Sequence, residues 1–146
     1  MSATDLGPFL YHYRAEVLRV VDGDTVDLLV ELGFYCGFQN RFRLAGIDAP
    51  EKNSADPGER AAAIKAADVL SSWLPRGEKV LIKTEMDRTE KYGRYLVWVF
   101  PESEAATISY NQFLVELGHA RPYGGGARFP LSPGDPNLSA RPAPTR

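Results

Sequence analysis

Residues 20–32 read VVDGDTVDLLVEL, two β-rich runs that are separated only by Asp22, Gly23 and Asp24. Val, Leu and Thr favour strands in this pattern, whereas Asp and Gly favour tight turns. The stretch therefore predicts two strands joined by a short turn, the first over 14–21 and the second over 25–32. Where the chain leaves the turn and enters the second strand, the side chains of Asp22 and Asp24 can point to the same side.

Three more apolar and β-branched runs are bounded by Gly, Pro, Asn and Asp, which predicts further strands over 39–45, 78–84 and 95–100. Five strands are the complement of a small barrel. Trp73 and Trp98 fall at inward phases of a helix and a strand, so both are expected in the core.

Residues 56–75, DPGERAAAIKAADVLSSWLP, predict a helix between the third and fourth strands. Asp56 can cap it and Pro57 suits its first position. Its inward face is expected to carry Ile64, Ala67, Leu70 and Leu74. A second helix is expected over 109–117, with Ser109 as cap. There, Phe113, Leu114 and Leu117 should face inward.

The chain divides into a lead-in over 1–13, one folded domain over 14–123 and a Pro/Gly-rich tail over 124–146. The tail is poor in periodic apolar residues, so it is expected to be disordered or to lie extended on the surface. A chain of 146 residues is long enough for one core and too short for two.

The composition excludes several classes of protein. No run approaches the roughly 18 apolar residues of a membrane span, and the N-terminus lacks the pattern of a secretory signal, which predicts a cytoplasmic protein that does not contact membranes. One cysteine and two histidines cannot form a four-ligand zinc site, so any metal should be a hard cation held by oxygens. A net charge of −2 argues against a broad basic surface for nucleic acid.

Acids and turn formers occur together in three clusters, VVDGDTV, RFRLAGIDAPE and DRTEKYGR, and the last two also carry arginine. Asp48 and Glu51 bracket a fixed turn at Ala49 and Pro50. Acids that share a cleft raise one another's pKa, and a divalent ion removes that penalty. Two aspartates and the Ala49 carbonyl would leave coordination positions of a calcium ion open for substrate and water. Guanidinium groups match phosphate oxygens, so Arg43 and Arg94 complete a clamp for phosphoryl transfer.

The ordered motifs D-G-D-T-V, F-R-L-A-G-I-D-A-P-E and T-E-K-Y-G-R resemble the staphylococcal-nuclease-like family over residues 17–123. The resemblance implies a five-stranded OB-fold barrel with flanking helices. It also implies a calcium-dependent endonuclease, although other divalent cations are compatible, that cleaves DNA and RNA with low sequence specificity.

Matched motif to motif, Asp24, Asp48 and the backbone carbonyl of Ala49 are the expected metal ligands. Arg43 and Arg94 correspond to the phosphate-binding arginines, and Glu51 to the carboxylate that activates or orients the attacking water. Lys91, Tyr92 and Tyr123 are the expected substrate contacts. Asp22 is either a carboxylate behind the metal ligands or a turn residue.

The sequence departs from the family in three respects: Ala49 stands where threonine is usual, and the tail replaces a third helix. In addition, the segment LGFYCGFQNRFRL makes the second hairpin long and aromatic, and the overall charge is acidic where well-known members are basic. Phe34, Tyr35 and Phe38 are open to three interpretations, a stacking platform, a subunit contact or a small hydrophobic cluster. The alternative to a nuclease is an OB-fold module that binds single-stranded nucleic acid or joins an assembly, with weak or no cleavage. In either case a homo-oligomer through this hairpin or the tail is compatible with the sequence.

Overall fold

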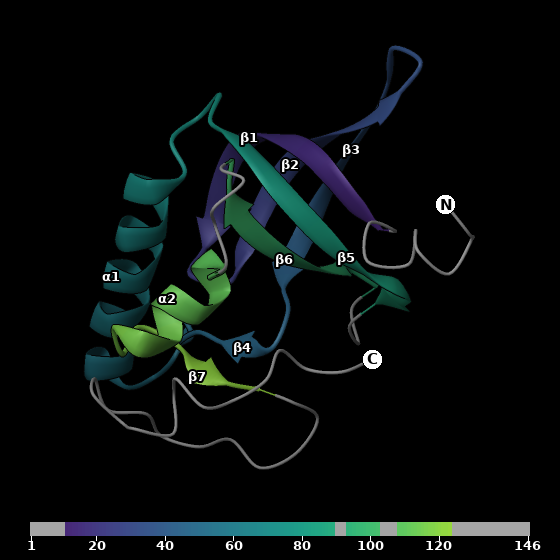
Figure 1. The fold of residues 1–146 in the computed structure, drawn as a ribbon. Helices are drawn as coiled ribbons and strands as arrows, with labels where there is room; N and C mark the ends of the chain where they lie inside the picture. The colour runs from purple at the N-terminus through teal and green to yellow at the C-terminus, as the bar shows by residue number, and fades with distance from the viewer. Residues whose placement is uncertain (1–10, 90–92, 103–107, 124–146) are drawn as a thin grey trace.

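The protein is described by a computed structural model over residues 11–89, 93–102 and 108–123 (Figure 1). In these parts of the chain, seven strands and two helices follow one another. In chain order they are β1 (His12–Asp22), β2 (Thr25–Gly33), β3 (Cys36–Leu44), β4 (Ile47–Asp48), α1 (Pro57–Trp73), β5 (Lys79–Thr89), β6 (Tyr95–Pro101), α2 (Tyr110–Glu116) and β7 (Arg121–Pro122).

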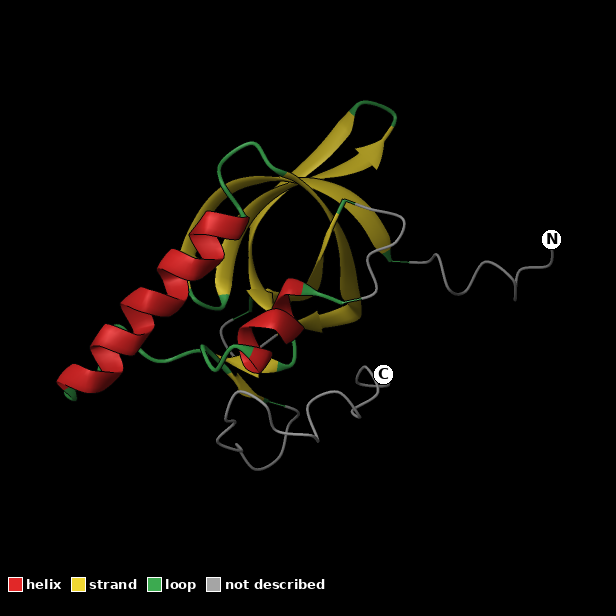
Figure 2. Cartoon of the chain, turned by 60° about the vertical axis from the view of Figure 1, so that its left-hand side comes forward, coloured by secondary structure: helices red, strands yellow, loops and turns green. Residues whose placement is uncertain are grey.

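Five of the strands close into a barrel in the order β1-β2-β3-β6-β5 (Figure 2). Neighbouring strands are antiparallel except β3 and β6, which run parallel from Phe42 opposite Tyr95 to Leu44 opposite Val97. Pairing of β1 with β5 completes the ring. The predicted five-stranded OB-fold barrel with two flanking helices is therefore confirmed, and β5 runs five residues beyond the predicted end at 84.

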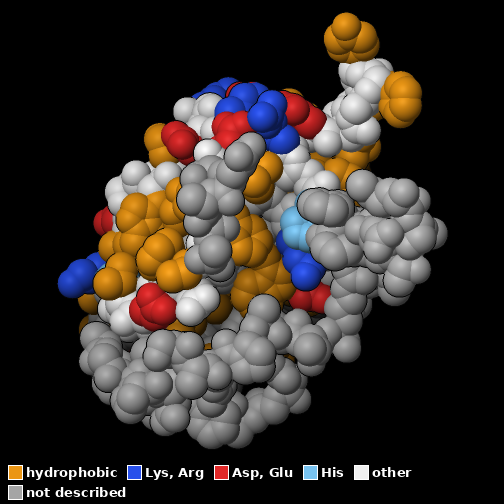
Figure 3. All heavy atoms as spheres, viewed as in Figure 1, with side chains coloured by type: hydrophobic (Ala, Val, Ile, Leu, Met, Phe, Trp, Pro, Cys, Tyr) orange, Lys and Arg blue, Asp and Glu red, His pale blue; other side chains and the backbone are white. Residues whose placement is uncertain are grey.

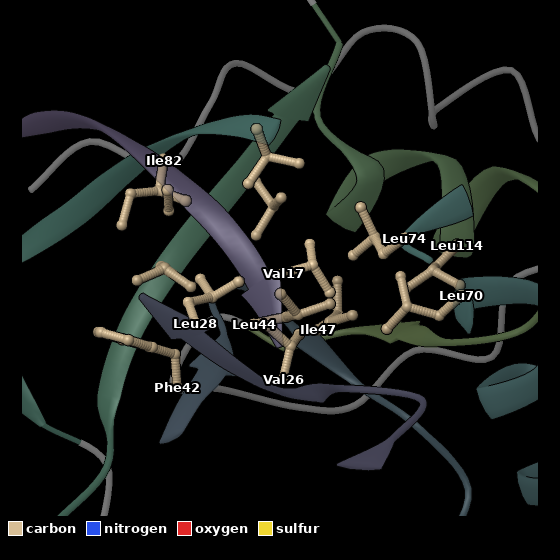
Figure 4. Packing of buried hydrophobic residues seen from close by; sticks show 14 of the residues in the cluster. Val17, Val26, Leu28, Phe42, Leu44, Ile47, Leu70, Leu74, Ile82 and Leu114 are labelled. Carbon is tan, nitrogen blue, oxygen red and sulfur yellow. The ribbon is translucent and has the colours of Figure 1, made fainter. Parts of the chain in front are cut away.

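The barrel core takes alternate residues from every strand, because successive strand side chains point to opposite faces. Val17, Leu28, Phe42 and Ile82 are essentially inaccessible to solvent (Figure 4). Val97 is buried to the same extent. Leu70 and Leu74 from the end of α1 and Leu114 from α2 pack against the same cluster. One continuous core thus joins the barrel to both helices.

Both helices begin where the sequence predicts. The Asp56 carboxylate accepts the backbone N–H groups of Gly58 and Glu59, and the Ser109 hydroxyl accepts that of Gln112. The predicted inward faces are partly wrong, because Ile64 and Leu117 are more than half exposed. α1 instead packs against β1 through small residues, and α2 buries Asn111, Leu114 and Val115. The buried residues of α1 are Ala63, Ala66, Ala67 and Leu70.

A second sheet, which the sequence did not predict, pairs β4 with β7. Ile47 lies opposite Pro122 and Asp48 opposite Arg121. Two residues are too short a run to be recognised as a strand from composition. This pairing brings the C-terminal end of the described chain to the segment that carries Asp48.

The tryptophans lie at the margin of the core rather than inside it, which corrects their predicted place. Trp73 is half-buried and stacks on Tyr110, with ring centroids 5.8 Å apart. Trp98 is also half-buried, and its indole N–H donates to a carboxylate oxygen of Glu85 at 2.8 Å. Its ring lies against Gly46, where an added Cβ would lie 2.5 Å from the indole; the φ of Gly46, +72°, also favours glycine. None of the helices in the described parts of the chain is long and apolar enough to cross a membrane.

Gly23, in the turn between β1 and β2, is buried against α1. A Cβ there would lie 2.8 Å from the Ala66 Cβ and 3.1 Å from the Ala49 Cβ. Neither methyl group can rotate away, so Gly23→Ala is expected to lower the free energy of unfolding by about 1 to 3 kcal/mol, measured by urea denaturation. Gly58→Ala is the matched control, since its Cβ would have no neighbour closer than 3.6 Å. Equal stability of the two variants would contradict the tight approach of α1 to this turn.

Candidate active site

Two aspartates converge on one arginine at an end of the barrel. A terminal nitrogen of Arg43, Nη2, lies 3.4 Å from Oδ2 of Asp24 and 3.1 Å from Oδ1 of Asp48. The side chains of Arg43, Asp24 and Asp48 are only 12%, 16% and 18% exposed, respectively. Charge interactions are therefore less screened by water here than at the surface.

The elements that position these groups are short and fixed by hydrogen bonds. Arg43 pairs with Thr25 across β2 and β3, which brings the end of β3 beside Asp24. The other terminal nitrogen of Arg43, Nη1, donates to the carbonyl oxygens of Leu44 at 3.0 Å and Ile47 at 2.8 Å. Arg43 thus also holds the turn that leads to Asp48.

The predicted ligand Ala49 lies beside the same pair of acids. Its backbone N–H donates to Oδ2 of Asp24 at 3.1 Å. Ala49 is buried, so a larger side chain at this position would have to displace its neighbours. This hydrogen bond helps to fix the turn that follows β4.

Arg94 reaches the site through Thr25, which the sequence reasoning missed. The Thr25 hydroxyl donates to Oδ1 of Asp24 at 3.0 Å and accepts from Nη1 of Arg94 at 3.1 Å. Thr25 is 1% exposed, so its hydroxyl has a fixed environment. The only signal in the sequence was its position directly after Asp24 in the turn.

Glu51 and Asp22 lie at the edge of this group. Glu51 is exposed in the loop between β4 and α1, with its backbone N–H 3.5 Å from Oε1 of Glu59. The Lys52 ammonium donates to the Val21 carbonyl at 2.7 Å and pairs with Asp22 at 3.0 Å. Lys52, which the sequence reasoning did not consider, thereby ties the Glu51 loop to the end of β1.

The predicted substrate contacts are described only in part. Tyr123 is partly exposed, and its backbone N–H donates to the Gly46 carbonyl at 2.7 Å, beside β4. It therefore lies near the segment that carries Asp48. Lys91 and Tyr92 fall outside the described residues.

Arg41, two residues from Arg43 on the same strand, has a different partner. Its guanidinium makes two hydrogen bonds to the Asp27 carboxylate, at 2.7 and 3.0 Å. The hydrogen bond from Arg41 holds the pKa of Asp27 below its ordinary value, against the opposing effect of partial burial. Of the two arginines in RFRL, the structure thus brings Arg43 to the acids and pairs Arg41 with Asp27.

The chemistry of the donor set fits a hard divalent cation. In the described parts of the chain, no three His, Cys, Asp or Glu side chains form a group that could hold a metal ion. The Asp24 and Asp48 carboxylates nevertheless converge on one positively charged group, and the Ala49 backbone is adjacent. Carboxylate and carbonyl oxygens are the ligands that calcium and magnesium prefer, with water completing the set.

Comparisons with known proteins show related sequences, two of which are named as nucleases. The chain is 36% identical to endonuclease YhcR of Bacillus subtilis (strain 168) over 117 residues, which cover 76% of this chain and 9% of that protein. It is also 36% identical to a micrococcal nuclease of Shigella flexneri, covering 76% of this chain and 59% of the relative. Protein ParB of Escherichia coli is 35% identical over 86% of this chain and 63% of its own length. The chain therefore spans less than two thirds of the length of each of these relatives.

The barrel topology defines an OB-fold protein, and two of these relatives are named as nucleases. The chain belongs to the family of staphylococcal nuclease homologues, whose model matches residues 41–129. That match includes Arg43, Asp48, Glu51 and Arg94. Asp24 precedes it and joins the site through the fold.

Proposed function

We propose that the chain is a divalent-cation-dependent endonuclease, with calcium as the cation, that hydrolyses phosphodiester bonds in DNA, RNA or both with low sequence specificity. The observation that carries the proposal is the convergence of Asp24 and Asp48 on Arg43. Arg94 is tied to the same group through Thr25. The nuclease relatives support the same reaction.

The carboxylates of Asp24 and Asp48 and the Ala49 carbonyl would hold the cation. When bound, the cation supplies Lewis-acid polarisation of a phosphoryl oxygen. Asp24 is held for this role by the hydroxyl of Thr25 and the backbone N–H of Ala49, at 3.0 and 3.1 Å. The Asp24 carboxylate therefore has little freedom to rotate, which keeps its oxygens directed at the proposed cation position.

Arg43 and Arg94 bind the non-bridging oxygens of the scissile phosphate and stabilise the charge that builds on them during attack. Both guanidiniums stay charged at any working pH. Nη2 of Arg43 contacts Asp24 and Asp48, so a cation bound by these carboxylates would leave Nη2 for the phosphate.

Glu51 positions a water molecule and accepts its proton as the water oxygen attacks phosphorus in line. A new P–O bond forms, the P–O bond to the leaving ester oxygen breaks, and the leaving oxygen takes up a proton. Exposure of Glu51 on its loop gives water access to the carboxylate. The Lys52–Asp22 pair joins the loop to the end of β1, which supports a role for Asp22 in positioning Glu51.

Lys91, Tyr92 and Tyr123 contact the remainder of the substrate. A tyrosine ring can stack on a base or sugar of any sequence, which fits low sequence specificity. The chain as a whole carries a net charge of −2, so attraction for phosphate must come from the cation and from this local group of basic residues.

Cleavage of end-labelled single-stranded DNA and RNA tests the proposal, with wild type, Arg94→Ala and Arg14→Ala in calcium or in EDTA. Arg14 is the matched control because it is an exposed arginine paired with Glu102, away from the site. Wild type and Arg14→Ala are expected to cleave in calcium only, and Arg94→Ala to be about 100-fold slower or worse. Binding without products in excess calcium would instead favour a single-strand-binding module.

A further inference from the structure

The tip of the β2–β3 hairpin is an exposed apolar surface that the proposed catalytic reaction does not use. The hairpin projects beyond the barrel, and its end carries two separate hydrophobic side chains in the space-filling view (Figure 3). Phe34 is 96% exposed and Tyr35 is fully exposed. The predicted alternative of a small hydrophobic cluster at the tip is therefore wrong for these two residues.

The backbone of this tip is not one that aromatic residues favour. Phe34 and Tyr35 have φ angles of +54° and +59°, the left-handed region at both central positions of the turn. Two-residue turns of this kind strongly prefer Asn-Gly or Asp-Gly. Folding of the hairpin alone would thus be better served by other residues, which points to a use for the two rings outside the chain's own core.

The strand edge behind the tip is also open. In the described parts of the chain, β3 pairs with β6 only through Phe42, Arg43 and Leu44, so its second edge has no strand partner over 36–41. Every residue from 31 to 41 is exposed. An open edge of this kind is a template for pairing with another strand.

The chemistry of the hairpin favours a protein partner over a nucleic acid. Residues 32–40, LGFYCGFQN, contain no charged side chain in a chain that is 25% charged. Affinity for nucleic acid comes mainly from positive charge on phosphates, and this segment offers none.

We propose that two copies of this chain associate through their β2–β3 hairpins, with the open edges of the two β3 strands antiparallel about a two-fold axis near Phe38. Such a pairing would bring the tip rings of one copy to Tyr95 of the other, where β6 begins beside Phe42. Phe38 and Tyr95 are each 40% exposed and their ring centroids lie 6.2 Å apart. One chain thus carries both a protruding pair of rings and an exposed aromatic surface to receive it, as a two-fold interface requires.

The area available is sufficient for such a dimer. Four tip rings at about 200 Å² each supply on the order of 800 Å² in total. The two strand edges with Leu32, Phe38 and Tyr95 raise this to about 1,200 Å², the lower end of the range for stable interfaces. This inference does not depend on the proposed catalytic activity.

Sedimentation equilibrium of the full chain over a range of concentrations tests the proposal, in reducing buffer so that the exposed Cys36 cannot cross-link copies. Wild type is expected to reach twice its monomer mass of 16.1 kDa. The double variant Phe34→Asn, Tyr35→Gly supplies the preferred turn residues, so it keeps the hairpin and is expected to remain monomeric. Ile64→Ser, which removes an exposed apolar residue from α1, is the matched control and should dimerise like wild type.

A monomeric wild type at every concentration up to the solubility limit overturns the proposal, and so does a double variant that dimerises as wild type does. If wild type is monomeric and only the double variant loses affinity for single-stranded DNA, the tip is a nucleic-acid contact and the dimer is wrong. Circular dichroism and thermal unfolding of each variant establish that the fold is retained.

Discussion

Replacing Arg43 by alanine is expected to lower kcat/KM for cleavage of single-stranded DNA in calcium by about 100- to 1,000-fold, or roughly 2.7 to 4 kcal/mol of transition-state stabilisation. The guanidinium lies 3.1 Å from Asp48 and 3.4 Å from Asp24, where the charge of a bound phosphate would also fall. Without it, that charge is stabilised by fewer groups. Initial rates over a range of substrate concentrations give kcat and KM separately.

The matched control is Arg41→Ala on the same strand. Arg41 forms an exposed pair with Asp27, which is worth at most about 1 kcal/mol in stability, and so has a different partner from Arg43. Its loss is expected to leave kcat/KM within a few-fold of wild type. Because Arg43 also holds the carbonyls of Leu44 and Ile47, the thermal stability of both variants must be compared. Equal loss of activity in the two folded variants would contradict the role of Arg43.

Replacing Asn111 by alanine is expected to lower the free energy of unfolding by about 3 kcal/mol. The Asn111 amide is completely buried; it accepts the Val99 N–H at 3.0 Å and donates to the Ala45 carbonyl at 2.9 Å and the Val97 carbonyl at 3.0 Å. Val97 keeps a hydrogen bond from the Ala45 N–H, but two buried groups lose the partner that Asn111 supplied. Urea denaturation measures the loss.

Gln112→Ala is the control for this change, one residue along the same helix. Its side-chain amide is half-buried and donates only to Glu116 within α2, at 3.1 Å. A change of less than about 0.5 kcal/mol is expected, as for an exposed helical pair. If both variants unfold at the same urea concentration as wild type, Asn111 does not fasten α2 to the barrel.

The barrel was predictable because its signals are local. Each strand has an apolar run bounded by turn residues, and the caps Asp56 and Ser109 mark the helix starts unambiguously. The inward faces of the helices were less predictable. α1 packs through alanines because β1 and the Gly23 turn approach it closely, and periodicity alone does not show that Ala66 is nearer the core than Ile64.

Long-range features could not be predicted from the sequence either. The β4–β7 pair joins two-residue segments more than seventy residues apart, and neither segment has a pattern that distinguishes it from a turn. Asn111 looks like an ordinary polar helix residue, yet it bonds to the turn that precedes β4 and to β6. Contacts of this kind depend on the completed fold.

The sequence supplied the candidate acids and arginines, and the structure brings Asp24, Arg43 and Asp48 together. The choice of Arg43 over Arg41 rested on the family motif, and the pairing of Arg41 with Asp27 now gives it a physical basis. Thr25 escaped notice because a threonine after a turn is a common strand residue. Its bridging of Asp24 and Arg94 is a tertiary contact.

The most direct test of a metal-dependent nuclease centred on Asp24 and Asp48 is the rate of DNA and RNA cleavage as calcium is titrated, with wild type and Asp24→Asn. Asparagine keeps the size of the side chain and an oxygen that can accept the Ala49 N–H, but removes the negative charge. Wild-type cleavage is predicted to rise with calcium, to saturate and to stop in EDTA, while Asp24→Asn stays about 100-fold slower or worse at every concentration. Equal wild-type rates in calcium and EDTA, or undiminished cleavage by Asp24→Asn, would contradict it.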